Sequence, residues 1–168
     1  MIKLLIFTFL ILTLVIISVL LFQSVTSART SEGFVKFIGK KNSIVFLEVA
    51  DSPEKKAQGL MNRPSLGPHR GMVFIFRPAT QVTFWMKDTL ISLDMIFINK
   101  GKIVKIVKGA IPNQTDILYP SDFPVTEVIE VNSGFTDTHM IKVGDRLVFE
   151  NIAQIDYSKG SKSMMALK

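Results

Sequence analysis

The sequence predicts a mainly β (α+β) domain with a curled or barrel-like, mostly antiparallel sheet of about eight short strands. One short helix accompanies the sheet, and an N-terminal transmembrane helix precedes it. Three observations support this prediction: β-branched and aromatic runs recur between Gly, Pro, Asn and Asp clusters, only residues 53–62 carry soluble-helix signals, and the first apolar run is long and uncharged. Closely spaced strands with a single helix favour a sheet that curls or closes.

The first element is the apolar run Leu4–Phe22, which has 19 residues and no charged side chain. As a helix it would measure about 28 Å, close to the roughly 30 Å hydrocarbon core of a bilayer. We favour a retained anchor within residues 1–28, because the apolar region of a cleaved signal is usually shorter. The small residues at 24–28 keep cleavage, and hence secretion, open.

The orientation of this segment is open to two interpretations. The basic residues that follow it would place the domain in the cytoplasm by the positive-inside rule, whereas a short basic start before a first apolar run is typical of exported proteins. We expect a membrane-anchored domain on the extracytoplasmic side, in the periplasm or outside the cell.

The remaining elements divide the chain further. Residues 29–42 are expected to be a linker with the first strand, residues 43–152 a single globular β-rich domain, and residues 153–168 a disordered tail. Strands are predicted at 34–38, 44–49, 72–76, 82–86, 94–98, 103–108, 126–131 and 146–151.

The predicted helix over 53–62 has clear start signals. Asp51 or Ser52 can cap it, and Pro53 suits its first position, while Gly59 weakens its second half. The loop that follows, 63–71, is rich in Pro and Gly.

Composition excludes several classes of function. The chain has no Cys and two His, so disulfide frameworks, thiolate chemistry and multi-histidine metal centres are excluded. We expect no metal site and no cofactor, because no recognised binding motif is present. The formal net charge of +6 is scattered rather than clustered with aromatic residues, so no nucleic-acid partner is expected.

The best candidate site is one face of a predicted hairpin. If Asp88-Thr89 forms its turn, apolar residues pair with apolar ones on the inner face, and polar ones share the outer face. That outer face would carry the only tryptophan of the chain among hydrogen-bonding groups, which suits a ligand stacked on the indole. Its members are Thr83, Trp85, Lys87, Ser92 and Asp94. Alternatively, Trp85 only covers the sheet, with its N–H bonded to Asp94.

Other charged residues are weaker candidates. Arg63 can bind a carboxylate or phosphate, or cap the last carbonyl groups of the helix. Glu130 has the strand parity of apolar neighbours, so we expect it to be partly buried and paired with Arg or Lys. His69 and His139 are separated by 70 residues without any motif, and we expect both at the surface.

Several motifs resemble those of the domain of unknown function family 192, over about residues 43–152. They are the segments at 49–54, 58–63, 71–76, 84–98, 110–112, 119–121, 130–134 and 143–145, of which the Phe-Trp-Met-Lys-Asp-Thr run is the most specific. Asp88 and Ser92 stand where Asn and Pro are common in that family. The resemblance implies a compact, mostly β domain that often follows an export signal, and it supplies no activity or catalytic residues.

We therefore expect a binding or accessory module of the cell envelope, with the Trp85 face as its site. Its partners would be the membrane, through residues 4–22, and an envelope small molecule, polymer or protein. One alternative is a hydrolase of an envelope sugar or peptide that uses a carboxylate pair such as Asp94 and Glu130. Another is a structural, partner-binding domain, whose sign would be an exposed apolar patch without a pocket.

Overall fold

The structure is a computed structural model that describes Thr13, residues 33–152 and Ile155. The chain divides into two compact units, Met1–Ser31 and Glu32–Lys168. The predicted anchor over 4–22, apart from Thr13, lies outside the described residues, as does the predicted tail over 153–168 apart from Ile155. Within the described part of the chain, no helix is both long and apolar enough to cross a membrane.

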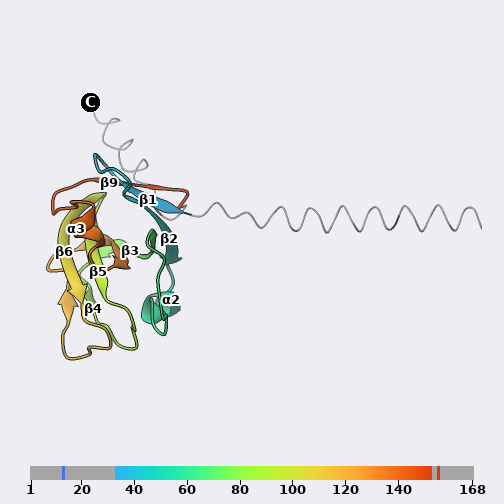
Figure 1. Cartoon of the computed structure of the whole chain (residues 1–168), viewed down its shortest axis with the longest axis vertical. Coiled ribbons are helices and arrows are strands. Elements are labelled where there is room, and N and C mark those ends of the chain that lie inside the picture. Colours follow the sequence, from blue (N-terminus) through green and yellow to red (C-terminus); the bar gives the residue numbers. More distant parts are fainter. Residues whose placement is uncertain (1–12, 14–32, 153–154, 156–168) are drawn as a thin grey trace, which may run out of the picture. The chain divides into compact units, whose positions relative to one another are not determined.

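A strongly curled, half-barrel sheet of seven strands forms the second unit (Figure 1). The strand order is β6-β5-β8-β3-β2-β1-β9, and every pair is antiparallel except β2 with β3. An isolated bridge between Lys102 and Arg146 joins β6 to the residue before β9. The strands are β1 (Phe34–Phe37), β2 (Ile44–Ala50), β3 (Arg70–Thr80), β5 (Leu93–Asn99), β6 (Lys102–Ala110), β8 (Val125–Asn132) and β9 (Leu147–Glu150).

Two short helices and a two-stranded ribbon complete the described unit. The helix α2 (Pro53–Gln58) starts as predicted, because the Ser52 hydroxyl accepts a hydrogen bond from the Lys55 N–H. It ends before the predicted boundary, because Gly59 has a positive φ of 48°. The helix α3 (Phe135–Thr138) is a single turn after β8, and the ribbon joins β4 (Thr83–Phe84) to β7 (Tyr119–Pro120).

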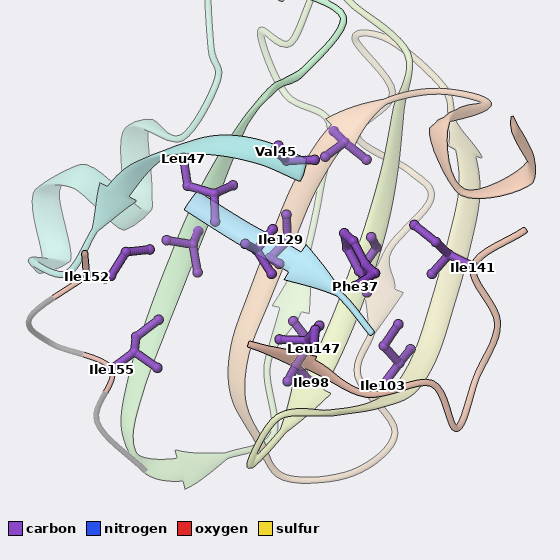
Figure 2. Packing of buried hydrophobic residues seen from close by; sticks show 14 of the residues in the cluster. Phe37, Val45, Leu47, Ile98, Ile103, Ile129, Ile141, Leu147, Ile152 and Ile155 are labelled. Carbon is purple, nitrogen blue, oxygen red and sulfur yellow. The ribbon is translucent and has the colours of Figure 1, made fainter. Parts of the chain in front are cut away.

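The central strands are covered on both faces by separate apolar clusters. The first core cluster gathers residues from both ends of the unit, including Phe37, Leu47, Ile98, Ile129 and Leu147 (Figure 2). The second core cluster is formed by the side chains on the opposite face of the same central strands, and it includes Met72, Phe74, Met95, Phe97 and Val128. The strands β5 and β8 are therefore buried along nearly their whole length.

Candidate functional site

The predicted hairpin between 82–86 and 91–95 is wrong. Phe84 pairs with Tyr119 in the β4–β7 ribbon, whereas Leu93 pairs with Ala110 and Asn132 in the large sheet. The alternation of polar and apolar residues was compatible with the hairpin, but it does not identify the strand that each segment pairs with.

Asp94 is consequently a buried structural residue and does not lie beside Trp85. Its side chain is 0% exposed, and it accepts hydrogen bonds from the Gly109 N–H at 3.0 Å and from the Thr136 N–H at 3.0 Å and hydroxyl at 2.7 Å. The sequence pattern suggested a solvent-facing position because polar and apolar residues alternate there. In the fold, the Asp94 side chain instead binds Thr136 of α3. Ser92 is also engaged, since its hydroxyl donates to the Ala110 carbonyl at 3.0 Å.

Thr83, Trp85 and Lys87 are all exposed, and Lys87 lies beside Trp85. Trp85 is 47% exposed, Thr83 and Lys87 are exposed, and Met86 between them is buried. The Lys87 ammonium lies 5.5 Å from the centroid of the Trp85 ring, within cation–π distance. Phe84 turns inward and meets the Phe74 ring edge-on at 4.9 Å.

Backbone hydrogen bonds fix the loop that carries Trp85. The Asn62 N–H donates to the Asp88 carbonyl at 2.7 Å, which ties this loop to the chain just after α2. On its other side, Met86 donates to Gln114 at 3.1 Å, and Asn113 donates to Thr89 at 3.0 Å. The backbone that follows Trp85 is therefore held by two segments that are distant from it in sequence.

Beneath this loop lies Glu130, two residues before the end of β8. Its register partners are Met72 on β3 and Met95 on β5, so the carboxyl group projects onto the face of the second core cluster. Glu130 is only 5% exposed, and burial raises its pKa to about 8. Its predicted burial is confirmed, but its predicted pairing is wrong. Within the described part of the chain, no side-chain hydrogen bond or ion pair reaches its carboxyl group, which lines a pocket.

Glu130 and Trp85 line the same small pocket, which we call the Trp85 pocket. Its volume is about 30 Å³. The α2 end supplies one wall, the loop of Trp85 the second, and the sheet the floor. The lining residues are Lys56, Ala57, Gln58, Gly59, Leu60, Met61, Phe74, Phe84, Trp85, Thr89 and Glu130. A carboxyl group thus shares a pocket with Trp85, as the sequence pattern predicted, but it belongs to Glu130 and not to Asp94.

Arg63 lies in a neighbouring hollow and binds a carboxylate of this same chain. Its guanidinium makes a two-pronged contact with Glu48, in which Nη2 donates to Oε2 at 2.7 Å and Nη1 donates to Oε1. Hydrogen bonding from Arg63 lowers the pKa of Glu48, and the pKa of Arg63 is raised in turn. The hollow of about 340 Å³ shares Gln58 and Gly59 with the Trp85 pocket.

The two histidines come together on another face of the unit. Their ring centroids are 6.0 Å apart, and the His139 ring lies 4.3 Å from that of Phe135. His69 is exposed as predicted, and His139 is half-buried. Among the described residues, no three or more His, Cys, Asp or Glu side chains are grouped so that they could hold a metal ion. A separation of 70 residues left no sequence signal for this proximity.

The fold and site together define a class: a small half-barrel β domain whose α2 end and Trp85 loop enclose one buried carboxyl group. Within that class, the chain belongs to the family DUF192, described as an "Uncharacterized ACR", whose profile matches residues 35–149. The match confirms the resemblance seen in the sequence motifs, and it begins within β1, at Val35. A comparison with curated proteins finds no match.

Two solved structures are similar to this chain. One is a proposed transcription regulator from Sinorhizobium meliloti 1021, with 32% identity, a TM-score of 0.66, and coverage of 72% of this chain and 94% of that one. The other is a protein of unknown function from Novosphingobium aromaticivorans DSM 12444, with 31% identity, a TM-score of 0.62, and coverage of 70% and 83%. The likeness supports the fold and carries no activity over to this chain.

Proposed function

We propose that this protein is a binding module of the cell envelope, anchored by residues 4–22, that takes a small chemical group into the Trp85 pocket. The observation that carries the proposal is Glu130, a buried carboxyl group without a partner among the described residues, which faces a pocket. A buried ionisable group with a strongly perturbed pKa that faces a pocket is a candidate for a functional site.

The energetics of Glu130 support this interpretation. Its neighbours on β3 and β5 are methionines, so a leucine would fit the chemistry of this part of the sheet. A carboxyl group there destabilises the fold at neutral pH, because burial disfavours its charged form. Such a residue is best explained by a ligand that compensates it when bound.

The geometry favours a binding module over the alternative of a two-carboxylate hydrolase. Asp94 pairs with Val131 and Glu130 pairs with Met95, so the two carboxyl groups leave the sheet on opposite faces. Asp94 is also fully occupied by Gly109 and Thr136. These two carboxylates therefore cannot act together on one substrate bond.

A ligand screen on the full chain in non-ionic detergent tests the proposal. Because Trp85 is the only tryptophan, its indole signal reports on the pocket without ambiguity. We expect a pocket ligand to shift that signal and raise the unfolding midpoint. The Trp85→Phe variant should bind more weakly, measured by calorimetry, whereas Leu118→Ala, an exposed apolar control outside the pocket lining, should keep the native affinity. If the folded chain responds to no small molecule, the alternative of a protein partner replaces the proposal.

The proposed location has its own test. The chain has no cysteine, so a single Val143→Cys change at an exposed position gives a unique label site. We expect a membrane-impermeant maleimide to label this variant in intact spheroplasts. Labelling only after lysis would place the domain in the cytoplasm and contradict the proposed location.

A further inference from the structure

Building on the proposed function, we propose that the Trp85 pocket binds the ammonium group of a primary amine, with the Glu130 carboxylate as its counter-charge. The amine can belong to a free small molecule or to a phospholipid headgroup, since both present the same chemistry.

The wall combines aromatic rings with one acid. Phe74, Phe84 and Trp85 line the pocket together with Glu130. Aromatic faces attract cations through their quadrupole, and a buried carboxylate gains most from a partner of opposite charge. The Trp85 ring already holds one ammonium group, that of Lys87, at 5.5 Å. Cation recognition is therefore the chemistry that this set of side chains serves best.

The size of the pocket selects among cations. Its volume of about 30 Å³ compares with roughly 10–15 Å³ for a site that holds one water molecule. An ammonium nitrogen and the carbon next to it fit this space, whereas a quaternary trimethylammonium group does not. The rest of the ligand would run outward past the half-exposed indole.

Few cations of the protein compete with the ligand for the Glu130 carboxylate. Lys56, from α2, is the other charged residue that lines the pocket, and its ammonium lies 4.8 Å from the centroid of the Phe76 ring. Lys87 lies over Trp85, and the strand neighbours of Glu130 on β3 and β5 are the uncharged Met72 and Met95. Because no neighbouring cation pairs with Glu130, burial favours its protonated form. An ammonium group that binds beside it must therefore displace this proton into solvent.

This proton exchange gives binding a characteristic pH dependence. With a Glu130 pKa of about 8, the ionised fraction rises about 50-fold between pH 6 and pH 8. The affinity for an alkylamine should rise by about the same factor over this range. A ligand that only accepts a hydrogen bond from protonated Glu130 would show the opposite trend.

The experiment titrates the full chain in non-ionic detergent with n-propylamine and follows the Trp85 indole N–H by NMR. n-Propanol is the uncharged control and tetramethylammonium the oversized one. We expect n-propylamine to bind at least about tenfold more tightly than either. Glu130→Gln should weaken binding about tenfold or more, and Lys56→Gln should strengthen it by removing a like charge. A second series with short-chain phosphatidylethanolamine or phosphatidylcholine distinguishes a headgroup from a free amine.

The outcomes separate this inference from the proposed function. Equal binding of n-propanol and n-propylamine, or an affinity that falls with rising pH, would overturn the amine assignment while leaving the pocket as a binding site. Tighter binding of tetramethylammonium would also overturn it. If no probe moves the indole signal at any pH and no ligand is found in the screen, both proposals fail.

Discussion

Replacing Glu130 with glutamine should remove most of the pH dependence of stability between about pH 5 and pH 8. Burial raises the pKa of Glu130 from its ordinary value of 4.5 to about 8. Below pH 4.5 the carboxyl is protonated in the folded and unfolded chains alike, so folding carries no penalty. Above pH 4.5 the unfolded chain releases the proton first, and the free energy of unfolding falls by about 1.4 kcal/mol per pH unit until about pH 8.

From these values, the native chain should lose about 3 kcal/mol of stability between pH 5 and pH 7.5 relative to Glu130→Gln. Urea unfolding at several pH values, followed by Trp85 fluorescence, measures both proteins with the same probe. The informative quantity is how the difference in unfolding free energy between the two proteins changes with pH. Its absolute value is not informative, because the buried amide of the variant destabilises the fold by an amount that does not depend on pH. Glu150→Gln, at an exposed carboxyl of β9, is the control and should keep the native slope. Parallel stability curves for the native chain and Glu130→Gln would refute the reasoning.

Three further predictions separate structural residues from site residues. Asp94→Ala should destabilise the fold by about 3 kcal/mol, because it leaves the buried donors of Thr136 without an acceptor. Ser92→Ala should destabilise it by about 1 kcal/mol, through loss of one hydrogen bond, and urea unfolding measures both effects. Trp85→Phe should change the unfolding free energy by less than about 1 kcal/mol, measured by calorimetry, while weakening ligand binding. Arg63→Lys should lose up to about 1 kcal/mol at pH 7. That loss should vanish as the pH falls through the lowered pKa of Glu48, and a pH-independent loss would contradict the ion pair.

Local patterns in the sequence predicted the local structure well. The positions of β1, β2, β5, β6 and β8 follow their β-branched runs, and Ser52 caps α2. The alternation within 83–87 also held, with Met86 inward and Trp85 outward. Each of these features depends on neighbouring residues, so a single sequence can carry the signal.

Features that depend on distant segments could not be predicted in this way. The segment at β4 pairs with β7, a strand of two residues that includes Pro120, which no strand pattern marks. Asp94 was predicted to be exposed because alternating polar and apolar residues are typical of a strand with one face in solvent. In the fold, β5 is covered on both faces. Glu130 was predicted to be buried but not to lack a partner, because the tertiary fold decides which cation comes near.

The most direct measurement is the titration of the Glu130 side-chain carboxyl by carbon NMR, with and without n-propylamine. We expect its pKa to be about 8 in the free protein and to fall when n-propylamine binds, because an ammonium group favours the charged carboxylate. Titration at its ordinary value of 4.5 would show that the pocket does not hold a buried acid, and would contradict the proposed site. A pKa near 8 that n-propylamine leaves unchanged would contradict amine binding.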